Sequence, residues 1–385
     1  MEFLGYRRRN RKVGVRNHVL ILSTVVCANE VAHRIKRRIA AAVVATHPFG
    51  CAILGADFEQ FKRTLVGFAN NPNVGAVLVV GLGCEQIDAP LLAAEIAKGG
   101  KLAEALLIQE CGGVQGTVRR GTEVVREMQG ILAREERVPS PVSELIMATE
   151  CGGSDFSSGL TANPAVGFVS DRLIELGGTV ILSETSEIIG AEHLLAVRAI
   201  NEEVARGIYG IVERMEGYAR RAGVDTRGSQ PTPGNIRGGI TSIEEKSLGC
   251  IYKAGTKPVQ GVVEYAESIA GRGLWVMDTP GQDVESITGM VAGGAQIVVF
   301  STGLGTPVGC PIAPVIKITG NPDTARKMKV HIDVDAGEIL KGRDTIEGVG
   351  ETLFRLLLEV ASGKQTKAER WGHGEFGINR IGVTL

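Results

Sequence analysis

The stretch HVLILSTVVCANEVAHRIKRRIAAAVVATH, residues 18–47, decides the fold class. Its apolar pattern predicts a buried strand over 18–26, an amphipathic helix over 28–40 and a second strand over 41–47. Continuously apolar strands joined by a helix are typical of a parallel sheet that is covered on both faces. We therefore expect an α/β fold.

The same alternation continues along the chain. Further strands are predicted at 74–83, 103–110, 144–148, 179–185, 273–278, 294–302 and 314–319, and helices at 58–69, 163–178, 191–222 and 344–363. A charged, Pro-containing joint at 134–144 is the best candidate for a first boundary, and a second joint at 223–239, rich in Gly and Pro, is predicted to be a loop.

These joints suggest how the chain divides. We expect an N-terminal α/β domain over 1–138 and a C-terminal α/β catalytic region over 139–385, with a further boundary within 223–239. The fold class is thus α/β, with two or three layered domains and largely parallel sheets.

Composition narrows the class of protein. An apolar content of 44% and a charged content of 22% are ordinary for a soluble globular protein of 385 residues. A net charge of −1 argues against a nucleic-acid partner, despite the basic run YRRRNRK at 6–12. No apolar run reaches the roughly 18 residues of a membrane span, and no signal peptide is apparent, so we expect a cytoplasmic protein.

Several of the seven cysteines follow predicted strands. They contain no CxxC pair, which argues against a zinc ribbon, and in a reducing compartment they are not a disulfide framework. Because ligands gather at the carboxyl ends of parallel strands, these positions are candidates for a site. The thiols at strand ends are Cys51, Cys84, Cys111 and Cys151.

Thiol, imidazole and carboxylate groups together suit a borderline metal such as iron or zinc. The candidate metal ligands are His47, Cys51, Cys84, Glu85, Glu150 and Cys151. For each cysteine alone, packing in the core is the alternative. We assign Cys27, Cys250 and Cys310 to that packing role.

A lysine-containing segment, IEEKSLGCIYKAG at 243–255, is a second candidate. Lys246 or Lys253 could hold a substrate carboxylate, or act as a base if burial lowered its pKa. The alternative is a helix surface with salt bridges to Glu244 and Glu245.

Several long motifs, in order, carry a resemblance to a known family. They are GYRRRNRKVGVRNHVLILSTVVCAN, HPFGC, RTLVGFANNPNVGAVLVVGLGCE, ECGGSDFSSGLTANPAVG, ILSETSEIIGAEHLL, GNIRGGITSIEEKSLGCIYKAG and STGLGTPVGCPIAPVIKITGN. From about Phe3 to Leu340 the chain resembles the large catalytic region of the altronate/galactarate dehydratase family.

The resemblance implies a lyase that removes water across C2 and C3 of a sugar acid to give a 2-keto-3-deoxy acid. It also implies a divalent metal, commonly Fe2+, with Mn2+ as the other candidate. D-altronate is the first substrate to consider, and galactarate is an alternative. A further alternative is the large subunit of a sulfolactate sulfo-lyase, in which sulfite leaves in place of water.

The first step of all these reactions is removal of a proton next to a carboxylate, and the resulting dianion needs cationic groups nearby. The resemblance places the six metal-ligand candidates around the metal. It implies catalytic or substrate-contacting roles for Lys246, Lys253, Asp155, His193 and Glu184, and substrate binding by Arg16, Asn17, Ser154 and Asn163.

The resemblance also bears on partners. Full-length members carry a small β-rich domain before this region, so we expect a separate small β-rich subunit, and also a homo-oligomer. Two other hypotheses stay open. One is an iron–sulfur cluster on Cys51, Cys84 and Cys151, and the other is a non-catalytic scaffold subunit.

Overall fold

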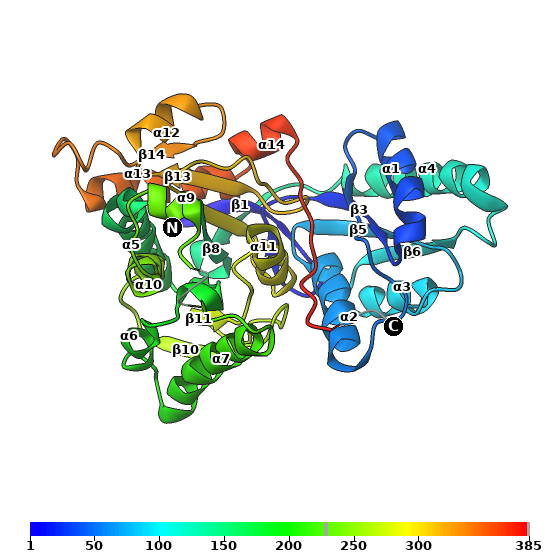
Figure 1. Cartoon of the computed structure of the whole chain (residues 1–385). Helices are drawn as coiled ribbons and strands as arrows, with labels where there is room; N and C mark the ends of the chain where they lie inside the picture. Colours follow the sequence, from blue (N-terminus) through cyan, green and yellow to red (C-terminus); the bar gives the residue numbers. More distant parts are fainter. Residues whose placement is uncertain (227–229, 383–385) are drawn as a thin grey trace.

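The computed structural model describes residues 1–226 and 230–382 and confirms a mixed α/β fold with parallel sheets (Figure 1). The first sheet has the order β4-β3-β5-β6, and all its neighbouring pairs are parallel. Its strands are β3 (His18–Ser23), β4 (Val43–Ala45), β5 (Val74–Gly81) and β6 (Leu102–Leu107).

Helices cover both faces of this sheet because its strands are apolar on both sides. Ile21 and Leu78 pack with α1 (Asn29–Arg38) and α4 (Gly113–Leu132). Leu20 and Val77 point to the other face, toward α2 (Gly55–Asn70) and α3 (Ala89–Lys98).

The second sheet has the order β10-β11-β9-β8-β12-β13-β14 and is also parallel throughout. Its strands are β8 (Ile146–Gly152), β9 (Thr179–Leu182), β10 (Val259–Val263), β11 (Gly273–Met277), β12 (Ile297–Thr302), β13 (Val315–Thr319) and β14 (Val334–Asp335). Helices α5 (Asn163–Glu175) and α13 (Ile346–Ala361) cover one face, and α11 (Asp283–Ala292) covers the other.

A small antiparallel sheet of order β2-β1-β7 joins the two parallel ones. It consists of β1 (Glu2–Arg7), β2 (Val13–Gly14) and β7 (Val138–Pro141). The joint at 134–144 contains β7, a strand that the sequence analysis did not predict. Two prolines fit there because β7 is an edge strand, where a missing N–H does no harm.

Two further predictions, one of a helix and one of a loop, need correction. The single helix predicted over 191–222 is two, α6 (Glu192–Ala196) and α7 (Glu202–Arg221), because the Asn201 side chain accepts from the Val204 N–H and starts a new helix. The joint over 223–239 contains the short α9 (Pro233–Arg237), and its residues 227–229 lie outside the described residues. Within the described chain, no helix is long and apolar enough to span a membrane.

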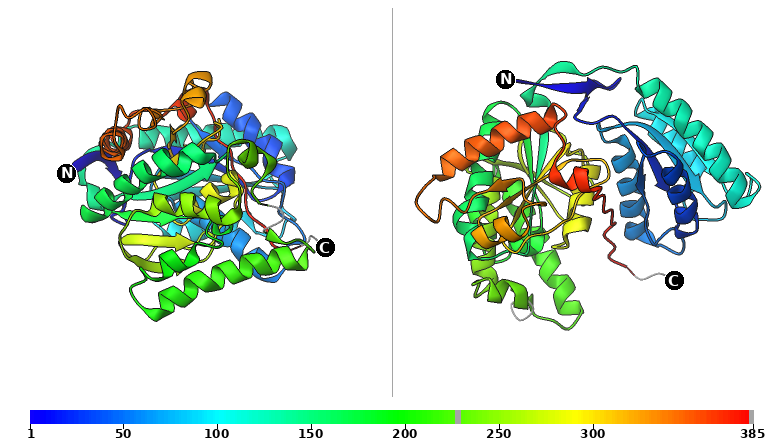
Figure 2. Two further views of the ribbon diagram at one scale, coloured as in Figure 1. Left: turned by 60° about the vertical axis from the view of Figure 1, so that its left-hand side comes forward. Right: turned by 90° about the horizontal axis from the view of Figure 1, so that it is seen from above.

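Helices α2 and α11 pack side by side between the two large sheets (Figure 2). Near their carboxyl ends, Gly67 approaches Ala292 so closely that a Cβ would lie 2.5 Å from its carbonyl oxygen. Near their amino ends, the tail residue Asn379 accepts a hydrogen bond from Gln60. Asn379 also donates to the Tyr265 hydroxyl, which donates to the Glu285 carbonyl.

The two helices are therefore parallel. As a result, the carboxyl ends of β4 and of β8 open toward the same side of the molecule. The C-terminal tail runs between the two sheets on that side (Figure 1, red).

Candidate active site

Eight ionisable side chains gather at the carboxyl end of β8. They come from β8 itself, from the turn after β9, from α10 (Ile243–Ile251) and the 3-10 turn Tyr252–Ala254, and from the first residue of α11. They are Glu150, Cys151, Glu184, Glu187, Lys246, Cys250, Lys253 and Asp283.

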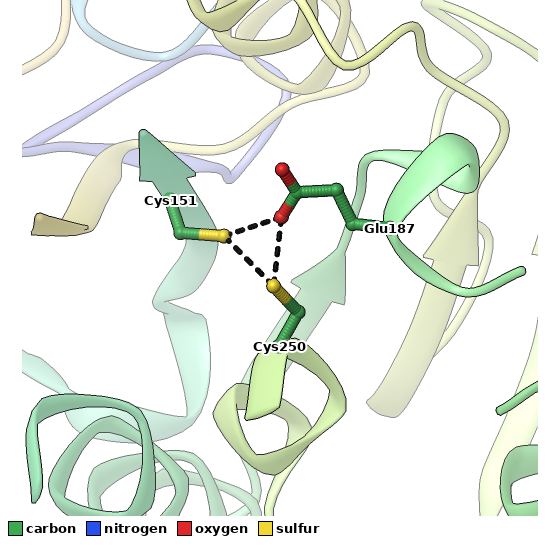
Figure 3. A group of neighbouring side chains, drawn as sticks. All are labelled: Cys151, Glu187 and Cys250. Carbon is green, nitrogen blue, oxygen red and sulfur yellow. Dashed lines mark hydrogen bonds between the residues drawn. The ribbon is translucent and has the colours of Figure 1, made fainter. Parts of the chain in front are cut away.

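Two thiols and a carboxylate form one half of this site (Figure 3). The Cys151 thiol donates to Glu187 Oε2 at 2.6 Å, and the Cys250 thiol donates to the same oxygen at 2.8 Å. The two sulfur atoms are 3.4 Å apart, and both residues are buried. Lys246 Nζ lies 2.9 Å from Glu187 Oε1, so every oxygen of this carboxylate has a partner.

These partners keep Glu187 ionised although it is buried. Burial alone would raise its pKa, but Lys246 and Lys253 outweigh it and lower the pKa to about 2. The reverse holds for Lys246, because the negative charge of Glu187 raises its pKa against the effect of burial. The pair is therefore charged at neutral pH.

Three carboxylates form the other half. Ligand-type oxygen atoms of Glu150, Glu184 and Asp283 all lie within 4.8 Å of one another. Burial, followed by the charge of a neighbouring glutamate, raises the pKa of each of the three. The pKa of Asp283 is raised to about 7. Gly152 makes room for it, since a Cβ there would lie 2.6 Å from Asp283 Oδ2.

Lys253 connects the two halves and is almost fully buried. Its Nζ donates to Cys151 Sγ at 2.6 Å and to Glu184 Oε2 at 2.9 Å. Burial alone would lower its pKa, but the thiol and carboxylate neighbours raise it, so Lys253 carries its proton. A fixed ammonium group therefore lies between a thiol and a carboxylate.

Glu184 is held in an unusual backbone conformation. Its φ of 66° is in the left-handed region, which is uncommon for a residue other than glycine. Such strain persists only where surrounding contacts impose it, and it is concentrated at functional sites. Here the Thr279 hydroxyl accepts from the Glu184 N–H, and the Glu184 carboxylate accepts from the Cys151 N–H.

A cavity of about 230 Å³ adjoins the thiol half. Lys246 and Cys250 line it, together with Ser154 and Asn163 from the loop and helix after β8. The Ser154 hydroxyl has no hydrogen-bond partner among the described residues, so it is free to contact a ligand. Asn163 instead bonds the Gly249 carbonyl and the Ser301 hydroxyl.

Asp155 also lines the cavity, but its oxygens are occupied. They accept from Ser157, from the Ser158 hydroxyl and backbone, and from the Asn321 amide. These bonds fix the turn that leads into α5. The contacts around Asp155 thus describe a residue that shapes the cavity wall.

The remaining metal-ligand candidates lie at the other parallel sheet. His47 donates from Nε2 to the Ser23 carbonyl and accepts from the Phe49 N–H at Nδ1, so neither nitrogen is free in this conformation. Glu85 accepts from the Thr24 hydroxyl and from three backbone N–H groups of its own turn. Both residues hold loops in place.

Cys51 and Cys84 are exposed on this first sheet, whereas Cys151 is buried in the second. The structure therefore does not bring together the three thiols of the iron–sulfur hypothesis, or all six candidate ligands. Cys27, assigned to packing, is also exposed, so that assignment was wrong.

Three other predicted residues lie outside the cluster of eight. Arg16 makes a two-pronged ion pair with Glu369 and bonds three backbone carbonyls. Asn17 bonds Arg8 and the Leu132 carbonyl. His193 is exposed on α6.

The sequence analysis missed three members of the cluster. Glu187 is three residues after Glu184, so a single turn could have indicated it. Cys250 lies between the two predicted lysines but was assigned to packing. Asp283 begins α11, the helix after β11, and not the strand end itself, so only the packing of the α11 amino end against Gly152 reveals it.

Comparison with known proteins defines the class. Residues 142–384 match the C-terminal region of D-galactarate/altronate dehydratase, and residues 5–133 match the second domain of D-galactarate dehydratase/altronate hydrolase. The chain therefore belongs to the D-galactarate/altronate dehydratase family, and it is an enzyme of the hydro-lyase type.

Individual relatives agree with this class. The chain is 40% identical to the (2R)-sulfolactate sulfo-lyase subunit beta of Chromohalobacter salexigens, over 98% of this chain and 97% of that subunit. It is 37% identical to the altronate dehydratase of Escherichia coli, over 99% of this chain and 78% of that enzyme. The altronate dehydratase of Bacillus subtilis is 36% identical, with 100% and 78% covered. The chain is thus a sugar-acid dehydratase or a closely related lyase.

Proposed function

We propose that the chain catalyses β-elimination from a 2-hydroxy acid, with D-altronate as the first candidate substrate. The C2 proton is removed, the C2 carbon acquires enediolate character, and the C3 hydroxyl leaves as water. The enol that forms becomes a 2-keto-3-deoxy acid. The observation that carries this proposal is the buried Lys253 ammonium between Cys151 and Glu184.

A fixed positive charge is what this reaction needs. Negative charge develops on the substrate carboxylate as the proton leaves, and a cation in a buried site stabilises it strongly. Lys253 also holds a proton that the departing hydroxide can accept. Asp283 is suited to take the C2 proton, because its pKa in the metal-free protein is about 7 and it is less buried than Glu150 and Glu184.

The residues present also fit a divalent cation such as Fe2+ or Mn2+. Glu150 Oε1 and Glu184 Oε1 are buried and, apart from each other's carboxyl group, have no hydrogen-bond partner among the described residues. A cation held by both would satisfy them, and one or two carboxylates with further oxygen ligands from substrate are a common arrangement. When bound, it would act as a Lewis acid toward the substrate oxygens.

The cavity next to the thiol half is where we expect the substrate to bind. Its carboxylate or hydroxyl groups can bond the free Ser154 hydroxyl and the Lys246 ammonium on the cavity wall.

A second candidate is the elimination of sulfite from sulfolactate. It is favoured by the match to the sulfo-lyase subunit, which is covered almost completely at 40% identity. Its first step is the same, and only the leaving group at C3 differs.

A substrate panel tests the proposal. The protein is isolated anaerobically from its own host, so that any separate small subunit co-purifies, and is assayed with Fe2+ or Mn2+. D-altronate and galactarate are scored for 2-keto-3-deoxy acids, and sulfolactate for sulfite and pyruvate. Turnover of one of them is expected. Failure on all three would overturn the proposal.

We further propose a separate small subunit and self-association. The sulfo-lyase relative is itself named as one subunit, and the altronate dehydratases extend beyond the matched region. Light scattering of the protein from its host, with mass analysis of its components, checks both.

The raised pKa of Asp283 predicts how stability depends on pH in the metal-free protein. Because its pKa is about 7 when folded and about 4 when unfolded, its contribution is full below pH 4 and is lost as the pH rises through 7. Asp283→Asn removes this loss. The variant should gain on the order of 2 kcal/mol over the parent between pH 4 and pH 8, as measured by urea unfolding with a chelator. A difference that does not change with pH would contradict the prediction.

A further inference from the structure

Three cysteines outside the site described above follow three adjacent strands of the first sheet. The strand order is β4-β3-β5, and the loops after these strands carry Cys51, Cys27 and Cys84 respectively. Since the strands are parallel, all three loops lie at one edge. All three thiols are exposed, which is unusual for residues that only pack.

The loops are fastened to one another next to the thiols. The Val26 N–H donates to the Phe49 carbonyl at 2.8 Å, which joins the Cys27 and Cys51 loops. The Gln86 N–H donates to the Gly50 carbonyl at 3.1 Å, which joins the Cys51 and Cys84 loops. Thr24 donates to Glu85, joining the first loop to the third.

The backbone of the middle loop is specialised for this contact. Gly50 has a φ of 130°, and a Cβ on it would lie 2.6 Å from Val25 Cα. Ala52, on the other side of Cys51, has a φ of 56°. A non-glycine residue in the left-handed region directly after an exposed thiol is the kind of strained position that binding sites show.

The thiols are neighbours, but they are too far apart for one ion to bind all three without rearrangement. Partial burial raises the pKa of the Cys51 thiol, and so do the charges of Cys27 and Cys84. Among the described residues, however, Cys27, Cys51 and Cys84 do not form a group whose potential ligand atoms all lie within 4.8 Å of one another. Sulfurs around a single tetrahedral zinc are roughly 3.8 Å apart.

Among the described residues, neither Glu85 nor His47 offers a free atom as a fourth ligand. Both oxygens of Glu85 are occupied by Thr24 and the backbone, and both nitrogens of His47 are occupied by backbone groups. A structural zinc site needs four protein ligands. A larger inorganic group, to which each thiolate contributes one bond at a different metal atom, fits three separated thiols.

We propose that Cys27, Cys51 and Cys84 bind a [4Fe–4S] cluster through three of its irons, leaving the fourth iron for a non-protein ligand. Assembly from ferrous and ferric iron in equal parts with sulfide balances the charge of the core, and each thiol releases one proton as its sulfur binds iron. The sheet edge that carries Cys27, Cys51 and Cys84 opens to the same side of the molecule as the elimination site. The cluster is independent of the cation proposed for Glu150 and Glu184.

The test is anaerobic purification of the full chain, followed by reconstitution with iron and sulfide in the presence of dithiothreitol. About four iron and four sulfide per chain are expected, with a brown colour and an electron paramagnetic resonance signal after reduction by dithionite. Cys27→Ser, Cys51→Ser and Cys84→Ser should each lose most of this iron and sulfide. Circular dichroism checks that each variant folds.

Two matched variants serve as controls. Cys111→Ser changes the thiol after β6, the fourth strand of the same sheet, and should keep full iron and sulfide content. Cys151→Ser should also keep the cluster, even though it damages the elimination site. A colourless protein after reconstitution, zinc in place of iron, or full cluster content in all three serine variants would overturn the proposal.

Discussion

Replacement of Lys253 by methionine is expected to lower kcat by about a thousandfold, because it removes the cation that stabilises the enediolate. Methionine keeps the length of the side chain, so the packing around this buried position should change little. The assay is formation of the keto acid from the substrate identified in the panel. Binding of substrate should be affected much less than turnover, because the charge it stabilises develops only in the transition state.

A second buried lysine provides the matched control. Lys317 is as buried as Lys253, but its Nζ bonds the Pro307 carbonyl and lies outside the cluster of eight. Lys317→Met also removes a buried ammonium, so it reproduces the effect on folding. Its kcat should stay within a few fold of the parent. Equal losses in both variants would mean that Lys253 acts only through stability.

The second large effect is expected for Glu184→Gln. The amide keeps the shape of the carboxylate but removes its charge, so the affinity for Mn2+ should fall by about a hundredfold or more, and turnover with it. Calorimetric titration of the chelator-treated protein measures the affinity. This follows from the buried Oε1 atoms of Glu150 and Glu184, which a cation would satisfy.

Cys250→Ser is the control that shows which half of the site binds the cation. Cys250 belongs to the thiol half, and its hydrogen bonds among the described residues go to Cys151 and Glu187. Its variant should retain the Mn2+ affinity of the parent within a few fold. If Cys250→Ser lost the ion and Glu184→Gln kept it, the cation would belong to Cys151, Glu187 and Cys250 instead.

The fold could be predicted from periodicity because its strands are apolar on both faces. Such strands, at 18–26 and 74–83, differ plainly from the amphipathic helices around them. The prediction failed where side-chain capping decides the start of a helix. At Asn201, such a cap begins a new helix within a stretch that looked like one continuous helix. The prediction also did not include β7 within 134–144, because edge pairing of β7 with β1 is a long-range contact that local composition does not show.

The site was predicted in part for a similar reason. The strand-end rule correctly drew attention to polar residues after strands, but it applies to both parallel sheets at once. The predicted ligand set combined Cys51 and Cys84, from one side of the predicted boundary at 138, with Glu150 and Cys151 from the other, and the two pairs belong to different sheets. Glu187, Cys250 and Asp283 were missed because their partners come from other elements.

The central claim is that this site removes the C2 proton of a 2-hydroxy acid with Lys253 stabilising the charge that develops. The most direct measurement follows the C2 proton of the substrate by NMR in D2O, with parent and Lys253→Met compared at equal saturation. The account predicts that the parent removes this proton as the keto acid appears, with deuterium at C3 of the product, and that the variant leaves it in place. Loss of the C2 proton at the parent rate in Lys253→Met would contradict the account.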